Sequence, residues 1–198
     1  MDGKVIEDGM GVANTMNNFF VNIGSNVDAK IPRGNSTFQS YMGEKNGTNF
    51  HILEISQTDI LEIIKKMNRS KAAGPFSIPT HILKDYGELI VNPLHCIINK
   101  SLREGIFPSL LKTARICPIF KKGDSMNCGN YRPISLLSNL SKIFERLFYN
   151  QLEHFLDVHN LIYKLQFGFR KKYSTNHALL SIVEKIRHNL DKGNFACI

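Results

Sequence analysis

The chain has 198 residues and a formal net charge of +8, and 42% of its residues are hydrophobic while 21% are charged. This balance is typical of a globular protein and excludes a disordered tail. No apolar run approaches the roughly 20 residues of a membrane-spanning helix, and the N-terminus carries no signal-peptide pattern. We therefore expect a soluble intracellular protein with no membrane partner, and the sequence does not distinguish nucleus from cytoplasm. The four cysteines form no zinc-binding pattern, so neither a metal site nor disulfides are predicted.

The basic charge is concentrated in one third of the chain. Residues 112–172 carry eleven Lys or Arg against four Asp or Glu, whereas residues 1–111 carry eleven of each kind. Concentrated positive charge favours a polyanion as partner, and nucleic acid is the commonest one. A solvated basic face without a partner explains the same charge equally well.

The first third of the chain predicts helices joined by a long connection. Apolar residues at helical spacing predict a helix over residues 11–23, and a stretch rich in Gly, Asn, Ser and Thr predicts an irregular connection over residues 24–49. Ser56 and Asp59 resemble a capping box at the start of a second helix. The apolar stripe of that helix consists of Ile60, Ile63, Ile64 and Met67.

The segment KAAGPFSIP, residues 71–79, predicts the end of that helix, and Pro79 suits the first turn of the next one. Apolar residues between positions 82 and 102 predict either one helix interrupted near Pro93 or two helices in series. Gly105 is the predicted C-terminal stop.

Two short β-like segments follow, TARICPIF at residues 113–120 and YRPISLL at residues 131–137. They flank a polar loop and therefore predict a β-hairpin, although the loop exceeds the usual length. Pro118 and Pro133 inside these strands predict an edge position or an irregular hairpin.

Two further helices are predicted in the last third of the chain. Ser138 or Ser141 caps the first of them, which closes at Asn160, and Ser174 or Thr175 caps the second. The predicted core face of the first helix is Ile143, Phe144, Leu147, Phe148, Leu152 and Phe155. The residues predicted to face inward on the second helix are Leu179, Ile182, Val183, Ile186 and Leu190.

Gly193 is predicted to end the final helix, and residues 194–198 predict the beginning of a strand. The whole pattern indicates an α+β fold that is mainly helical and contains one β-hairpin.

The predicted hairpin carries cations that suit an anion clamp. Lys121 and Lys122 stand on one arm and Arg132 on the other. Lysine supplies a mobile point charge, and arginine supplies a planar fork that matches phosphate oxygens. Gly123 and Gly129 let the loop backbone approach a ligand. The alternative is a hairpin tip with ordinary solvent-facing lysines.

The segment QFGFR combines aromatic faces with polar donors. Phe167 and Phe169 flank Gly168, and Gln166 and Arg170 stand at the two ends. Aromatic rings interleaved with cations hold nucleic-acid backbones and stacked bases, at roughly 1–3 kcal/mol per base. The alternative is a pair of core phenylalanines around a turn glycine, which we expect to hold for at least one of the two.

No motif for chemistry on a substrate is present. The sequence has no phosphate-binding P-loop and no G-x-S-x-G nucleophile motif. No pair of aspartates is placed to bind Mg²⁺, and beyond Arg170 the only acids are Glu184 and Asp191. We therefore assign no catalytic and no metal-binding residue.

Taken in order, four long motifs closely resemble one family. They are KAAGPFSIP, LREGIFPSLLKTARICPIFKKGD, NYRPISLLSNLSKIFERL and QFGFRKKYSTNHALL. The chain resembles the reverse transcriptases, or RNA-directed DNA polymerases, of jockey-like and LINE-like non-LTR retrotransposons, from about Ile52 to its last residue. The N-terminal part resembles the segment that follows the endonuclease in such polyproteins. Where family members commonly read G-P-D-G-I-P, this chain has Phe76 and Ser77 in place of the aspartate and the second glycine.

This resemblance implies a right-hand polymerase fold. Residues 1–50 are then a helix and flexible linker before the reverse transcriptase domain, and residues 51–198 are its N-terminal part, the fingers and an incomplete palm. By motif match, Lys121 or Lys122 and Arg132 meet the triphosphate of the incoming dNTP. The residues implied along the template strand are Gln166, Gly168, Phe169 and Arg170.

The resemblance also implies partners and a cofactor. The partners are an RNA template, a DNA primer or target, and dNTP, while the C-terminal palm, the thumb and the upstream endonuclease are missing. Mg²⁺ is implied for the full-length enzyme and no cofactor for this chain, because the metal-binding aspartates lie beyond it. Phosphoryl transfer needs metal held by carboxylates, so we expect the chain alone to be inactive in primer extension.

Two other functions compete with a polymerase fragment. The chain is either a non-catalytic basic module that binds RNA or DNA, or a non-functional genomic relic. The template RNA, the oligomeric state, and whether the chain is expressed or folds alone do not follow from the sequence.

Overall fold

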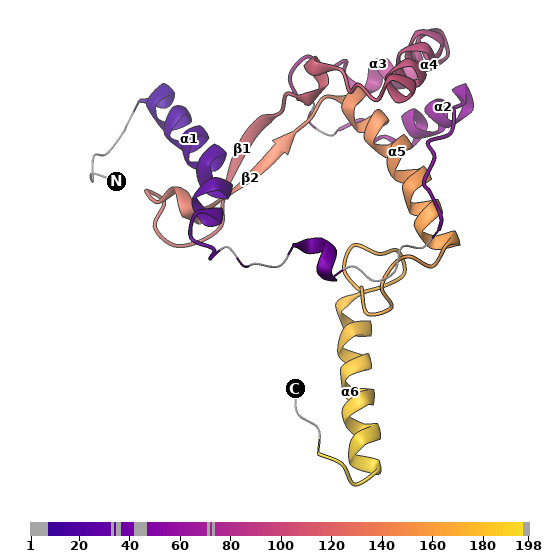
Figure 1. Ribbon diagram of the computed structural model, residues 1–198. Coiled ribbons are helices and arrows are strands. Elements are labelled where there is room, and N and C mark those ends of the chain that lie inside the picture. Colours follow the sequence, from indigo (N-terminus) through magenta and orange to yellow (C-terminus); the bar gives the residue numbers. More distant parts are fainter. Residues whose placement is uncertain are drawn as a thin grey trace. The chain divides into compact units, whose positions relative to one another are not determined.

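The computed structural model describes residues 8–32, 34, 37–41, 47–70, 72 and 74–195 (Figure 1). The chain divides into two compact units, which we call unit 1 (Met1–Gln151) and unit 2 (Leu152–Ile198). Within the described part, none of the helices combines the length and the apolar character that a membrane span needs.

The described elements are mainly helices with one antiparallel hairpin, as the sequence predicts. They are α1 (Gly9–Asp28), η1 (Phe38–Tyr41), α2 (Gln57–Lys66), α3 (Thr80–Asp85), α4 (Gly87–Glu104), η2 (Ser109–Lys112), β1 (Arg115–Phe120), η3 (Cys128–Asn130), β2 (Tyr131–Leu136), α5 (Asn139–Val158) and α6 (Thr175–Asp191). The predicted division into a helix and linker (residues 1–50) and part of a polymerase domain (residues 51–198) refers to the domains of a longer protein. It stays a prediction.

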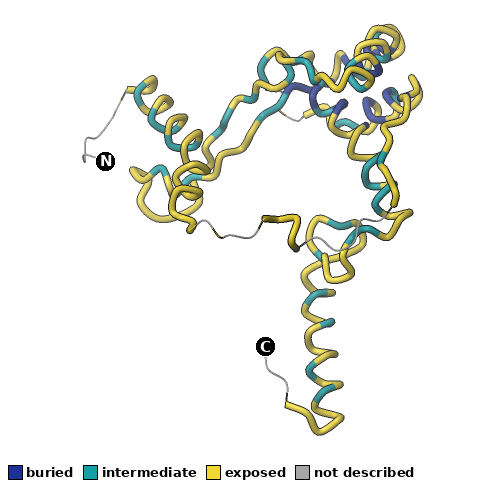
Figure 2. The backbone as a smooth tube through the Cα atoms, in the orientation of Figure 1, coloured by how far each residue is buried: buried dark blue, intermediate teal, exposed yellow. Residues whose placement is uncertain are grey.

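The core of unit 1 lies where α2, α3, α4 and the first part of α5 meet (Figure 2). Its buried apolar residues are Ile55, Ile60, Ile63, Ile64, Leu83, Val91, Leu94, Ile98, Ile143, Phe144 and Leu147. Full burial of such a side chain is worth about 1.5–3 kcal/mol. Neither strand of the hairpin contributes a buried residue, so the hairpin extends from this core without forming part of it.

The capping box predicted for α2 is present. The Ser56 hydroxyl accepts a hydrogen bond from the Asp59 backbone N–H at 3.1 Å, and the Asp59 carboxylate accepts one from the Ser56 N–H at 3.0 Å. Two N–H groups that helix geometry leaves without partners are thereby satisfied. The three isoleucines predicted for the apolar stripe are buried, which confirms that part of the pattern.

The region after α2 contains two helices in series, but the break is not at Pro93. It falls at Tyr86, between α3 and α4, and Pro93 lies inside α4. A proline at this position removes one bond to the carbonyl of Leu89. Leu89 is exposed, so water can satisfy that carbonyl. Gly105 ends α4 with φ of 66°, as predicted.

Two side-chain amides hold the extended segment before α2. The buried amide of Asn99 in α4 bonds both the N–H and the C=O of Ile55, at 2.8 and 2.9 Å. The amide of Gln151 in α5 bonds both the N–H and the C=O of Leu53, at 2.8 and 3.0 Å. Each amide replaces the partner strand that an extended backbone otherwise needs.

Phe76 occupies the position where the sequence motif departs from its family pattern. Its φ is 51° and its side chain is 72% exposed. The left-handed region costs a residue with a β-carbon about 1–2 kcal/mol, and asparagine tolerates it better.

We expect Phe76→Asn to raise the free energy of unfolding by about 1 kcal/mol, measured by urea denaturation. Phe76→Ala is the control, because it removes the ring but keeps the β-carbon. An equal gain from both variants contradicts the backbone explanation.

Ser138 is the residue that caps α5. Its hydroxyl accepts from the Ser141 N–H at 3.1 Å, which resolves the two alternatives. Within the predicted core face, Ile143, Phe144 and Leu147 are buried. The predicted burial of Phe148 is wrong: its side chain is 40% exposed and packs edge-on against Phe50. Leu152 and Phe155 are half-buried.

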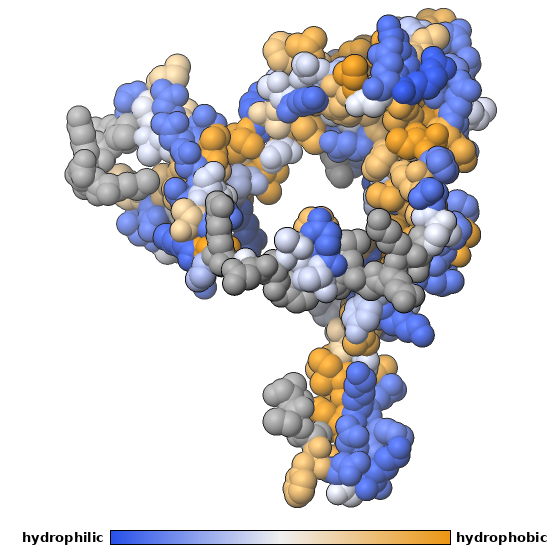
Figure 3. All heavy atoms as spheres, in the orientation of Figure 1, coloured by the Kyte–Doolittle hydropathy of each residue, from blue (hydrophilic) through white to orange (hydrophobic). Residues whose placement is uncertain are grey.

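In unit 2, α6 has the predicted place but not the predicted burial. None of its residues is buried, and Leu179, Ile182, Val183 and Leu190 are exposed. Figure 3 shows apolar residues along one side of α6 and polar residues along the other. The spacing therefore identifies the apolar face correctly, but no described element covers that face. Residues 194 and 195 are not in a strand, and residues 196–198 of the predicted strand lie outside the described residues.

Candidate nucleotide and nucleic-acid contacts

The hairpin is regular over its whole length. Six residue pairs connect β1 with β2, and Pro118 lies directly opposite Pro133. The Lys121 N–H donates to the Asn130 carbonyl at 2.9 Å, so pairing continues one residue beyond the strands. Bonded and non-bonded pairs alternate in an antiparallel ladder, which puts both prolines at a non-bonded pair. The prediction of an irregular hairpin is therefore wrong, whereas the alternative of an edge position holds for both strands.

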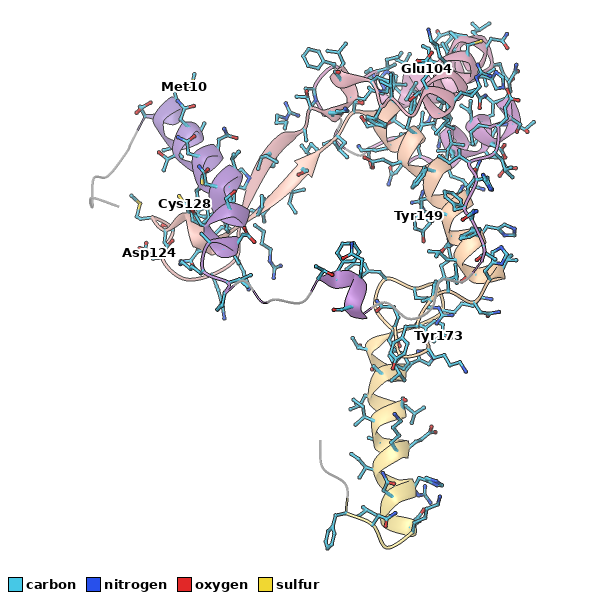
Figure 4. The ribbon with its side chains drawn as sticks, in the orientation of Figure 1. Met10, Glu104, Asp124, Cys128, Tyr149 and Tyr173 are labelled. Carbon is cyan, nitrogen blue, oxygen red and sulfur yellow. The ribbon has the colours of Figure 1, made fainter. Side chains whose placement is uncertain are left out.

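The loop at the hairpin tip, which carries Asp124 and Cys128 (Figure 4), is held by hydrogen bonds that cross it. The Asn130 amide donates to the Asp124 carbonyl, and the Tyr131 hydroxyl donates to the Ser125 carbonyl, each at 2.9 Å. Gly123 has φ of 93°, and a β-carbon there would lie 2.9 Å from the Asn130 amide nitrogen. The tip therefore depends on glycine at this position, and its hydrogen bonds tie the loop to the end of β1 and the start of β2.

The register separates the two candidate lysines. Arg132 pairs with Ile119, and Lys121 follows Ile119 by two residues. Side chains two apart on a strand share a face, as do directly paired residues. Lys121 and Arg132 therefore share one face of the hairpin, whereas Lys122 lies in the bend that leads to Gly123. All three side chains are exposed.

Hydrogen bonds seat both ends of the hairpin on the core of unit 1. After β2, the Leu137 carbonyl accepts from the Gly74 N–H at 3.1 Å. Before β1, the Leu111 carbonyl accepts from the Ser141 hydroxyl in α5 at 2.8 Å. Gly74 and the start of α5 thus form the base from which the clamp residues extend.

The predicted template residues lie within residues 161–174, which form most of the connection between α5 and α6. Gln166 turns its amide back to donate to the Gly168 carbonyl at 2.9 Å, so one of its donors stabilises the loop itself. Phe169 has φ of 57° and is fully exposed, which excludes a core role for it. Its ring is free to stack on a planar ligand.

Arg170 and Phe167 converge on a residue that sequence reasoning missed. The Arg170 guanidinium carbon lies 4.3 Å from the centre of the Tyr173 ring, and Phe167 meets the same ring edge-on at 5.9 Å. Phe167 is half-buried and is not among the buried core residues, so the expectation that at least one of the two phenylalanines is a core residue is met only in part. The only signal for Tyr173 was its position three residues after an arginine in a polar segment.

The groups around the clamp do not suit Mg²⁺. The cations Lys121, Lys122 and Arg132 repel a metal ion, and the Asp124 carboxylate already accepts from the Met126 N–H at 2.9 Å. Across the described ranges, no three His, Cys, Asp or Glu side chains gather closely enough to bind a metal.

Comparison with known proteins relates the chain to mobile-element polymerases. It is 32% identical over 143 residues to the RNA-directed DNA polymerase from mobile element jockey of Drosophila funebris, covering 72% of this chain and 16% of that protein. It is 34% identical over 145 residues to the probable RNA-directed DNA polymerase from transposon BS of Drosophila melanogaster, and the match covers 73% of this chain and 16% of that protein. The corresponding polymerase from transposon X-element of the same species is 31% identical over 138 residues, covering 69% and 15%. No family model matches the chain.

Proposed function

The chain belongs to the RNA-directed DNA polymerases of jockey-like non-LTR retrotransposons, and on that premise we propose that its β1–β2 hairpin binds the triphosphate of a deoxynucleotide and its 161–174 loop contacts template RNA. The matched part spans about 16% of the relatives' length. We therefore propose polymerisation only for a longer protein that contains this chain, and not for the chain by itself. We assign the helical core and hairpin of unit 1 to the fingers of a right-hand polymerase, and unit 2 to the approach to its palm.

The observation that carries the proposal is the shared face of Lys121 and Arg132. Two exposed cations on one side of the hairpin provide a fork and a point charge for phosphate oxygens. Neither side chain makes an ion pair with a described residue, so neither must release a partner before it binds phosphate. A dNTP carries the concentrated negative charge that such a pair attracts.

The two neighbouring lysines provide the test of this geometry. We expect Lys121→Ala to weaken binding of dye-labelled dUTP about fivefold to tenfold, the loss of one favourable phosphate contact. Lys122→Ala removes the same charge from the bend and is expected to bind nearly as the parent chain does. The measurement is fluorescence anisotropy at low ionic strength, where exposed charges are least screened. Equal losses from the two variants reject the assignment by register.

A second candidate is a module that binds RNA without catalysis. The observation in its favour is the excess of eleven basic over four acidic residues in 112–172. Such binding releases counterions, so the affinity must fall steeply as salt rises. Binding of RNA that is strongly salt-dependent, together with unchanged affinity for dUTP in Lys121→Ala, favours this module over the nucleotide clamp.

A further inference from the structure

We infer that Tyr173 is a positioning residue for Arg170, and that it holds the Arg170 guanidinium ready for a phosphate group of single-stranded RNA. The inference rests on the proposed template-binding role of the 161–174 loop and adds to it a residue outside the QFGFR segment.

A backbone turn brings the two side chains together. The Tyr173 N–H donates to the Arg170 carbonyl at 3.3 Å, which closes a turn through Lys171 and Lys172. Lys172 has φ of 65°, and this left-handed residue reverses the chain. Arg170 and Tyr173 stand at the two ends of the turn, and the guanidinium carbon lies 4.3 Å from the ring centre. That distance is well within the range of about 6 Å for a cation–π contact.

The Tyr173 ring is itself held by neighbours. Phe167 contacts it edge-on at 5.9 Å, and the His177 ring lies 6.1 Å away at the first turn of α6. His177 is fixed in turn by a hydrogen bond of 2.9 Å between its Nδ1 and the Ser174 hydroxyl. A ring placed between two others has little freedom to rotate, so it provides a defined surface for the guanidinium.

Among three consecutive cations, the structure distinguishes Arg170. Lys171 is ion-paired with Glu153 in α5, so its charge is compensated. Lys172 is exposed and contacts no aromatic ring in the described part of the chain. Arg170 is half-buried against Tyr173, and stacking uses only the flat face of a guanidinium. Its N–H groups lie in the plane and stay available for two phosphate oxygens.

The test uses the whole 198-residue chain and a dye-labelled oligouridylate of about 16 nucleotides, followed by fluorescence anisotropy at several salt concentrations. We expect Tyr173→Leu, which still packs on Phe167 but offers no π face, to weaken binding about twofold to fivefold. Tyr173→Phe keeps the ring and is expected to bind as the parent chain does. Lys30→Ala, which removes an exposed charge from the connection between α1 and η1 in unit 1, is expected to have no effect.

A double-variant cycle separates positioning from general stability. If Tyr173 acts through Arg170, then Arg170→Ala combined with Tyr173→Leu binds no more weakly than Arg170→Ala alone. The log–log salt slope is then lower by about 0.7 in either single variant, as for one lost phosphate contact on a single strand. Thermal melting accompanies each variant, and if Tyr173→Leu does not fold, Tyr173→Met replaces it in the same cycle.

The outcomes distinguish the inference from the function on which it rests. Additive losses in the cycle, or equal losses from Tyr173→Phe and Tyr173→Leu, overturn the positioning role while Arg170 remains a template contact. Unchanged binding by Arg170→Ala overturns the template contact itself.

Discussion

Replacing Gly74 with alanine is expected to destabilise unit 1 by about 3 kcal/mol. A β-carbon at this position would lie 2.2 Å from the Leu136 carbonyl oxygen and 2.6 Å from the Leu137 carbonyl carbon. Both are backbone atoms at the junction of β2 and α5, and they cannot rotate away as a side chain can. Either the junction moves or the hydrogen bond from Gly74 to the Leu137 carbonyl breaks. The base of the hairpin is lost in both cases.

Thermal unfolding followed by circular dichroism measures this effect. A loss of about 3 kcal/mol corresponds to a decrease in Tm of roughly 6–12 °C for a chain of this size. Gly47→Ala is the control, since a β-carbon there meets no atom within 4 Å. If Gly74→Ala has the same Tm as Gly47→Ala, the predicted clash of a β-carbon at Gly74 with the Leu136 and Leu137 backbone is wrong. A parent chain without a cooperative transition supports the genomic relic instead.

Replacing Arg132 with alanine is expected to weaken dUTP binding about tenfold to hundredfold. A hydrogen bond to a charged group is worth about 1.5–3 kcal/mol, and a bidentate guanidinium loses its contacts together. Arg132 is exposed on β2 and faces the same side as Lys121, so the variant leaves the core of unit 1 unchanged. Anisotropy of dye-labelled dUTP measures the affinity, and circular dichroism confirms that the fold is retained.

Arg132→Lys is the matched control for this result. It keeps the charge and loses the planar fork, so its affinity is expected to fall between those of the parent chain and Arg132→Ala. If Arg132→Lys binds dUTP as tightly as the parent chain does, the positive charge alone is sufficient, and the proposed bidentate contact of the guanidinium is wrong. If Arg132→Ala binds like the parent chain, the hairpin is not the triphosphate site.

Features that depend on neighbouring residues could be predicted from the sequence. Ser56 and Asp59 cap α2 because both partners lie within one helical turn, and Gly105 ends α4 because glycine readily adopts the left-handed conformation that commonly ends a helix. The hairpin follows from two β-like runs around a polar loop. The candidate clamp residues could be named for the same reason, although only the register shows which lysine shares a face with Arg132.

Features that depend on distant partners could not be predicted. Burial of the α6 stripe requires an element to cover it, and the spacing of Leu179 and Val183 reports only that a face exists. The amide of Asn99 is 44 residues from the Ile55 backbone it bonds, and no local pattern indicates such a pair. Tyr173 was missed because its relation to Arg170 is created by a turn with an uncommon left-handed lysine.

The most direct test of the account is to map where a nucleotide contacts the chain. NMR spectra of the isotope-labelled chain, recorded during titration with dTTP and separately with thymidine, report on each backbone amide. We expect dTTP to shift the amides of the β1–β2 hairpin around Lys121 and Arg132, and thymidine to leave them unchanged, because the clamp binds the triphosphate. Equal shifts from both ligands, or shifts from dTTP that leave the hairpin unaffected, would contradict it.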